Sequence, residues 1–264
     1  MAPALRSPMA SRSPLASRTN FEGLQSPVSV VSCPETFIDI PTGHDVDRLL
    51  QSWPVADGCL QCRVTRERSK NLLELYVEEG NVFVLSAVRT GNDWHISEQK
   101  GGSTKAYIAT VTTQKDGSTF TCGRAKAGDE LLYVRHEATE GSGDMPELNM
   151  IQVGQAVDVD ASPSVLANAG HAPKLGQQPR NAGVAILESR LPKWNGRTKT
   201  YELQFHGRAK LASARNFQLV HRGGQRERPV LLYGKLDDDV FALDFAHPLS
   251  ILQAFAIVLT TWKW

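Results

Sequence analysis

An apolar run near the C-terminus constrains this chain more than any other feature. It extends from Pro248 to Thr260 and reads PLSILQAFAIVLT. Between Leu249 and Leu259 only Ser250 and Gln253 are polar, and β-branched residues are a minority, so the run predicts a helix. Proline suits the first helical position, so we expect this helix to begin at Pro248. At about 1.5 Å per residue it is about 20 Å long, too short to cross a bilayer alone.

A helix that is apolar on every side must be enclosed by the rest of the protein. The other regular segments of this chain have the composition of strands, and a sheet that surrounds a helix must close into a barrel. The sequence therefore predicts a mainly β fold with one core helix, in which a closed antiparallel barrel encloses the C-terminal helix. The alternative is a membrane anchor at the end of the chain, and both the length of the run and Lys263 count against it.

Several segments predict the strands of that barrel. Short apolar runs flank turns rich in Gly, Asp or Asn, as hairpins do: Leu73–Val77 with Val82–Leu85, Tyr107–Val111 with Thr119–Cys122, and Val230–Tyr233 with Val240–Leu243. Residues 201–211 alternate almost perfectly between apolar and polar, so we expect a strand there with a bend at Gly207. A short helix is predicted over Asp45–Trp53.

Composition shifts indicate the domain organisation. Residues 1–28 are rich in Ser, Pro and Arg and predict a disordered tail, whereas residues 29–264 have the composition of one globular domain. The polar, Pro- and Gly-containing segment from Asp158 to Asn181 predicts a long loop between two β regions.

Charge and cysteine content argue against several classes of function. The net charge of +1 gives no chain-wide field toward nucleic acid, so we expect no nucleic-acid partner, and any anionic partner requires a local basic patch. Four cysteines are few for a disulfide scaffold, which indicates a reducing compartment. Cys59 and Cys62 form a lone CxxC without the further ligands that zinc needs.

No pattern in the sequence predicts catalysis. There is no nucleophile elbow, P-loop or dinucleotide-binding glycine motif, and His206 has no partner at a telling spacing. We therefore expect no enzyme activity, no catalytic residue, no cofactor and no metal site.

The last third of the chain carries an ordered series of motifs. They are Pro192-Lys193-Trp194-Asn195, Tyr201-Glu202-Leu203-Gln204-Phe205-His206-Gly207-Arg208, Asn216-Phe217-Gln218-Leu219, Asp239-Val240-Phe241, Pro248-Leu249 and Gln253-Ala254-Phe255-Ala256-Ile257. This series resembles the C-terminal domain of tubby and tubby-like proteins, most strongly over residues 190–260 and more thinly back to about residue 55. The resemblance implies a twelve-stranded barrel threaded by a hydrophobic C-terminal helix. It also implies a structural role in the core for Phe205, Gly207, Phe217, Phe241 and Phe255.

The same resemblance implies where a ligand would bind. The best-known activity of the family is binding phosphatidylinositol 4,5-bisphosphate, whose headgroup requires Lys and Arg donors. Alignment puts the pocket lysine and arginine of the family at Thr110 and Thr112, a further arginine at Glu147 and an asparagine at Asp93. Each lost charge-assisted hydrogen bond forfeits roughly 1.5–3 kcal/mol, so the headgroup pocket is expected to be weakened. Four cations around the same strands are candidates for a substitute basic face: Lys105, Lys115, Arg124 and Lys126.

Three functions remain open on this sequence. The first is a monomeric, non-enzymatic adaptor at phosphoinositide-bearing or other anionic membrane surfaces, cytoplasmic and peripheral, with a weakened headgroup pocket. The second is a protein-interaction scaffold that has lost phosphoinositide binding and engages an unidentified protein. The third and weakest is a nuclear, transcription-linked regulator, and a ciliary location is a further alternative for the adaptor.

Overall fold

The fold follows from one closed sheet. The computed structural model describes residues 46–126, 130–156 and 184–262, all within the compact unit Glu35–Trp264. The predicted tail over residues 1–28, the boundary at residue 29 and the predicted loop over Asp158–Asn181 lie outside these residues and stay predictions.

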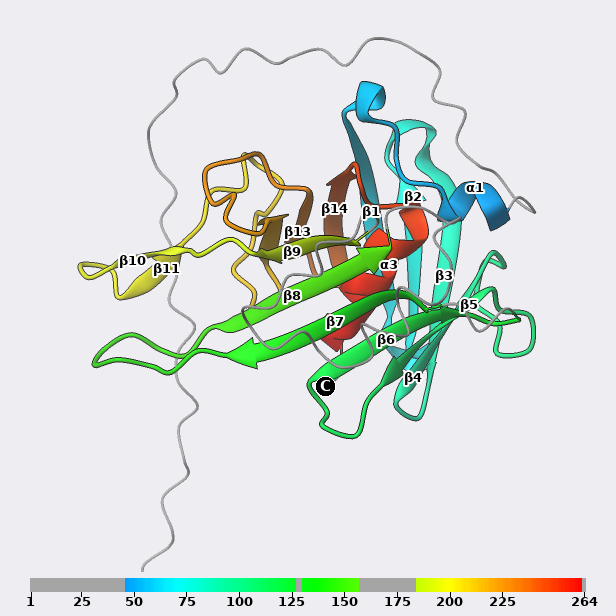
Figure 1. Cartoon of the computed structure of the whole chain (residues 1–264), viewed down its shortest axis with the longest axis horizontal. Coiled ribbons are helices and arrows are strands. Elements are labelled where there is room, and N and C mark those ends of the chain that lie inside the picture. The colour runs from blue at the N-terminus through cyan, green and yellow to red at the C-terminus, as the bar shows by residue number, and fades with distance from the viewer. Residues whose placement is uncertain (1–45, 127–129, 157–183, 263–264) are drawn as a thin grey trace, which may run out of the picture. The chain divides into compact units, whose positions relative to one another are not determined.

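Twelve antiparallel strands form the barrel, as predicted (Figure 1). Around the barrel they run in the order β1, β14, β13, β12, β9, β8, β7, β6, β5, β4, β3 and β2, and β2 closes onto β1. Their bounds are β1 Cys59–Glu67, β2 Leu72–Val77, β3 Val82–Thr90, β4 Asp93–Ser97, β5 Ala109–Thr113, β6 Thr119–Arg124, β7 Glu130–Ala138, β8 Asn149–Ala156, β9 Val184–Ser189, β12 Phe217–His221, β13 Leu231–Asp237 and β14 Val240–Ala246. A separate two-stranded sheet pairs β10, Lys193–Asn195, with β11, Thr200–Glu202.

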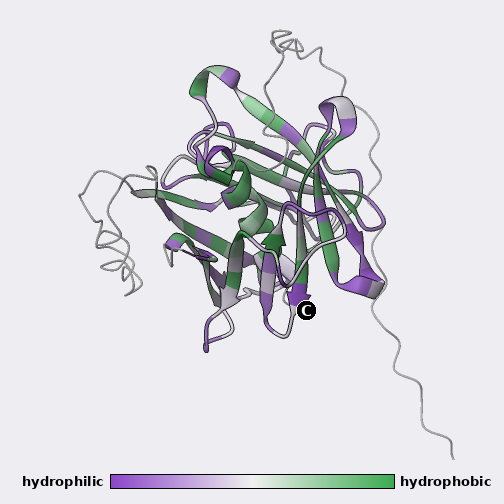
Figure 2. Cartoon of the chain, turned by 90° about the vertical axis from the view of Figure 1, so that its right-hand side faces the viewer, coloured by the Kyte–Doolittle hydropathy of each residue, from purple (hydrophilic) through white to green (hydrophobic). Residues whose placement is uncertain are grey.

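Helix α3, Ile251–Leu259, lies inside the barrel, as the apolar run predicts (Figures 1 and 2). All nine of its residues are buried, and a 3-10 turn over Thr260–Trp262 continues it. The second helix among the described residues, α1, is a single short turn at Val46–Leu50 that packs against α3 with Leu49 and Leu50 buried. Enclosure thus gives every apolar face of α3 a partner.

The helix does not begin at Pro248, which corrects the prediction. Ser250 is the N-cap residue: the backbone N–H of Gln253 donates to the Ser250 hydroxyl at 3.1 Å, and the Gln253 amide oxygen accepts from the Ser250 N–H at 3.0 Å. This reciprocal capping box satisfies donors that a buried helix end cannot expose to water. The Gln253 side chain also donates to the Leu131 carbonyl at 3.2 Å, which explains a polar residue inside the core.

The predicted strand over residues 201–211 is wrong. Only its first two residues continue β11, and the chain turns at His206 and Gly207, whose φ angles are 50° and 82°. From there the segment lies against β13, where the Lys210 N–H donates to the Lys235 carbonyl at 2.8 Å. Gly234 permits this approach, because a Cβ at that position would lie 2.6 Å from the Arg208 carbonyl oxygen. The alternation of half-buried and exposed side chains therefore comes from a segment that covers a sheet rather than joins it.

The predicted core residues divide accordingly. Phe217, Phe241 and Phe255 are buried members of the hydrophobic core, with 8%, 3% and 0% of their surface exposed. Phe205 is only half-buried and lies outside the core, and Gly207 is exposed at a turn, so the expectation of core positions for these two is wrong. Their covering segment lies outside the barrel wall, and only the bend expected at Gly207 is confirmed.

Candidate functional site

An open hollow of about 350 Å³ lies on the barrel wall over β5, β6 and the start of β7. It forms on the outer face because β5 alternates: Ala109 and Val111 point into the core, whereas Thr110 and Thr112 point outward and are half-buried. The hollow is lined by Thr110, Thr112, Thr121, Cys122, Gly123, Arg124 and Glu130. The two threonines that align with the family's pocket cations therefore do line a hollow.

The ladder between β5 and β6 builds the floor of this hollow. Thr112 pairs with Thr121, so two hydroxyl side chains stand on the same face of neighbouring strands. Thr110 pairs with Gly123, which has no side chain and leaves space beside it. The hollow thus offers hydroxyl groups where a headgroup pocket needs cations.

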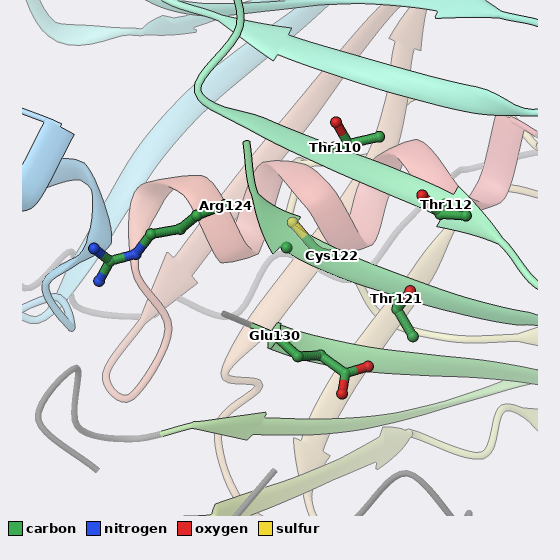
Figure 3. Close-up of a pocket in the computed structure, with 7 residues that line it drawn as sticks. Thr110, Thr112, Thr121, Cys122, Arg124 and Glu130 are labelled. Atoms are coloured by element: carbon green, nitrogen blue, oxygen red, sulfur yellow. The ribbon is translucent and has the colours of Figure 1, made fainter. Parts of the chain in front are cut away.

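Two ionisable groups complete the lining. Figure 3 shows the Arg124 side chain directed away from the threonines, whereas the Glu130 carboxylate lies near Thr121. Burial raises the pKa of Glu130 above its ordinary value. Among the described residues that line the hollow, Arg124 is the one cation and Glu130 the one carboxylate. This arrangement accepts and donates hydrogen bonds but concentrates no positive charge.

The other two residues aligned with the family's pocket do not line the hollow. Asp93 begins β4 beside Trp94, which pairs with Val111, so Asp93 lies near the Thr112 end of β5. Glu147 is exposed in the connection between β7 and β8. The four predicted positions therefore split into two that line the hollow and two outside it.

The four cations proposed as a substitute basic face also separate. Arg124 lines the hollow, but Lys105, Lys115 and Lys126 are exposed and do not. Lys115 lies in the turn after β5, while Lys126 follows β6 at the opposite end of the ladder. Five residues of strand separate those ends by about 16 Å. The structure does not gather these four into a single face.

Sequence reasoning missed Thr121 and Glu130. The alternation along β6 could have revealed Thr121. Thr119, Thr121 and Gly123 are each two residues apart in a segment predicted as strand, so they share one face. Glu130 had no such signal, since it lines the hollow only through the pairing of β7 with Gly123.

The two cysteines of the CxxC lie on opposite faces of β1. Cys59 is exposed and Cys62 is buried, because three residues along β1 bring a side chain to the opposite face. Burial raises the pKa of the Cys62 thiol well above its ordinary value and that of the Cys122 thiol to about 12. Within the part of the chain that the structure describes, no three His, Cys, Asp or Glu side chains gather as a metal site.

An ionic cluster that the sequence did not predict anchors the covering segment. The Arg208 guanidinium donates to both oxygens of Asp244, at 2.7 and 2.5 Å, and to both oxygens of Glu78, at 2.9 Å each. The pKa of Asp244 lies above its ordinary value, because the effect of burial outweighs the opposing effect of the hydrogen bonds from Arg208. All three guanidinium nitrogens of Arg208 donate to these carboxylates, so this cluster is a structural clamp between β14 and the segment before β12.

Comparisons with known proteins agree with this barrel. A model described as the Tub family matches residues 144–263. Tubby protein homolog 1 of Caenorhabditis briggsae is 27% identical over 248 residues, which cover 79% of this chain and 58% of that relative. Over the matched residues this chain is similar to the Tub family.

Two further relatives of the Tub family match a shorter stretch. Tubby-related protein 3 of Mus musculus is 48% identical over 75 residues, 28% of this chain and 16% of that protein. Tubby protein homolog 1 of Caenorhabditis elegans is 44% identical over 78 residues, 30% of this chain and 18% of that protein. The matched parts span little more than half of the Caenorhabditis briggsae relative and under a fifth of the other two. Any activity of those proteins is therefore only a proposal for this chain.

Proposed function

We propose that this chain is a non-enzymatic adaptor that binds anionic membrane surfaces, phosphoinositide-bearing ones included, through a barrel whose headgroup pocket is weakened. Similarity to the Tub family over residues 144–263 supports membrane-lipid binding as the general activity. The proposal includes a cytoplasmic, peripheral location and a monomeric barrel. Within the described residues no helix has the length and apolarity that a membrane crossing requires.

The residues that line the hollow are the observation that supports a weakened headgroup pocket. A phosphate group bound there meets the hydroxyls of Thr110, Thr112 and Thr121 and the carboxylate of Glu130. Hydroxyl donors form neutral hydrogen bonds of about 1 kcal/mol, whereas charge-assisted bonds contribute roughly 1.5–3 kcal/mol. The carboxylate adds repulsion at neutral pH. Binding should therefore depend on the total negative charge of the membrane more than on the identity of the headgroup.

A vesicle co-sedimentation assay tests this function. We expect enrichment on phosphatidylcholine vesicles that contain phosphatidylserine or phosphatidylinositol 4,5-bisphosphate over vesicles of phosphatidylcholine alone, and a loss of that enrichment as salt is raised. Equal recovery on anionic and neutral vesicles would overturn the proposal.

A scaffold function is the second candidate, and Glu130 favours it. A carboxylate beside three hydroxyls suits a polar protein surface better than a phosphate. This reading predicts no vesicle binding at any lipid composition, so the same assay separates the two candidates. A nuclear, transcription-linked role is a third candidate, supported by no site in the described residues, and salt-resistant binding to a DNA duplex would revive it.

A further inference from the structure

Positive charge is concentrated in one part of this chain. Residues 188–228 contain ten Lys and Arg against three Glu and no Asp, although the whole chain has a net charge of only +1. The rest of the chain is therefore net negative. Such an asymmetry indicates a local basic surface for an anionic partner. The small net charge of the whole chain conceals this surface.

Three of these cations lie in the connection between β12 and β13, which we name the arginine loop and define as residues 222–228. Arg222, Arg226 and Arg228 are all exposed, and none of them forms an ion pair with another described residue. The loop is drawn in orange in Figure 1, as the colour bar shows for residues near 225. It presents three unpaired guanidinium groups within seven residues.

The fold holds this loop in place. The Gly223 N–H donates to the Glu188 carboxylate at 3.0 Å, and the Gln225 amide donates to the same oxygen at 3.3 Å. The Glu227 N–H closes a turn on the Gly224 carbonyl at 2.9 Å. Glu188 accepts from a backbone N–H and an amide and thereby orders the loop. The loop itself contains three arginines and one acid, Glu227, so its net charge is +2.

An exposed leucine adjoins the loop. Leu191 has 55% of its surface exposed, and its backbone N–H donates to the Gln225 side chain at 3.0 Å. It is one of only three large hydrophobic residues that are exposed among the described residues. Beyond it, Trp194 of β10 contacts Tyr201 of β11 edge to face at 5.0 Å, and both rings are half-buried. An exposed apolar side chain thus adjoins the arginine loop through Gln225.

We propose that the arginine loop and Leu191 form the surface by which this protein contacts an anionic lipid bilayer. The inference rests on the proposed function and assigns the main membrane contact to this surface, with the hollow as a weaker contact. Arginines attract the negative lipid headgroups, and a leucine among them gains free energy by entering the interfacial layer of the bilayer. A nucleic acid satisfies the arginines equally well but offers a leucine nothing comparable. The exposed Leu191 therefore favours a lipid bilayer over a nucleic acid as the partner.

This surface is separate from the hollow. Strand β9, which carries Glu188, lies four strands from β5 in the barrel order. Neighbouring strands are about 4.8 Å apart, so β9 lies about 19 Å along the wall from β5 and about 10 Å from β7, the near edge of the hollow. Substitutions at one surface should leave the other intact.

The test compares three forms of the full chain on phosphatidylcholine vesicles with and without phosphatidylserine. We expect Arg222→Gln, Arg226→Gln and Arg228→Gln together to lower partitioning onto anionic vesicles by about 100-fold, since each basic residue near such a surface contributes about fivefold. The matched control replaces Arg68, Lys70 and Lys100 with Gln, which are exposed on other strand connections, and should change partitioning by no more than about twofold. Thermal unfolding of each form checks that it folds.

Leu191→Ala provides the second measurement. We expect it to lower partitioning onto anionic vesicles about fivefold and to leave binding to a DNA duplex unchanged. If the wild-type chain binds no anionic vesicle, the proposed function fails together with this surface. If the wild type binds and the arginine variant binds equally, only the surface is wrong. A loss confined to duplex binding in the arginine variant would overturn lipid as the partner.

Discussion

Helix α3 and the hollow lie on opposite faces of the same strands, and different requirements determine their residues. Along β5, Ala109 and Val111 face the core around α3, whereas Thr110 and Thr112 face the hollow. The inner residues must be apolar because a fully buried helix has no other neighbours. The outer residues meet only solvent or a partner. A barrel can therefore keep its fold while the chemistry of its outer wall changes, and a family fold predicts the inner face better than the outer one.

The largest expected effect comes from the inner face. Phe255→Ala removes a side chain with no exposed surface and should lower the free energy of unfolding by about 3–5 kcal/mol. Thr112→Ala, on the other face of the wall, should change it by less than about 0.5 kcal/mol. Urea denaturation of both variants measures the difference. Equal destabilisation by the two substitutions would contradict the comparison.

A smaller loss of stability is expected at the ionic cluster of Arg208, Asp244 and Glu78, where residues outside the core stabilise the fold. Arg208→Ala leaves the carboxylates of Asp244 and Glu78 beside each other without a cation and should lower the free energy of unfolding by about 3 kcal/mol. Lys210→Ala, an exposed residue of the same segment, serves as the control and should have little effect. A stability for Arg208→Ala equal to that of the control would show that the clamp contributes nothing.

Two substitutions should convert the hollow into a headgroup-binding pocket. Thr110→Lys with Thr112→Arg restores the two cations that the family resemblance implies and should raise affinity for phosphatidylinositol 4,5-bisphosphate vesicles by about 100-fold. The matched control places the same cations at the exposed Gln51 and Gln61, where only a small non-selective gain is expected. Co-sedimentation measures both. No selective gain would mean that the hollow is not the headgroup position.

The smallest effect concerns pH. The pKa of Glu130 is raised by burial, so its carboxyl group takes up a proton at a higher pH than an ordinary glutamate. Protonation removes its repulsion, and binding to anionic vesicles should rise a few-fold as pH falls through that raised pKa. Glu130→Gln should bind a few-fold better at neutral pH and lose its part of the pH dependence. A wild type and variant with identical pH profiles would exclude Glu130 from the site.

The sequence predicted the interior well because enclosure leaves few alternatives. The apolar run of α3, the hairpin of β2 with β3 and that of β5 with β6 follow from local pattern alone. The error over residues 201–211 has a long-range cause: Gly234 and the partners of Arg208 hold that segment against the barrel, and alternation does not reveal them. The hollow was predicted in part, since Thr110 and Thr112 came from resemblance, but Glu130 joins them only through tertiary pairing.

The most direct test of the account is the headgroup selectivity of the unaltered chain. Vesicles containing phosphatidylinositol 4,5-bisphosphate are compared with vesicles whose phosphatidylserine content gives the same surface charge. We predict equal partitioning onto the two, because the hollow presents hydroxyls and a carboxylate where a selective pocket presents cations. Partitioning many-fold stronger onto the bisphosphate vesicles, and resistant to salt, would contradict this account of the outer wall.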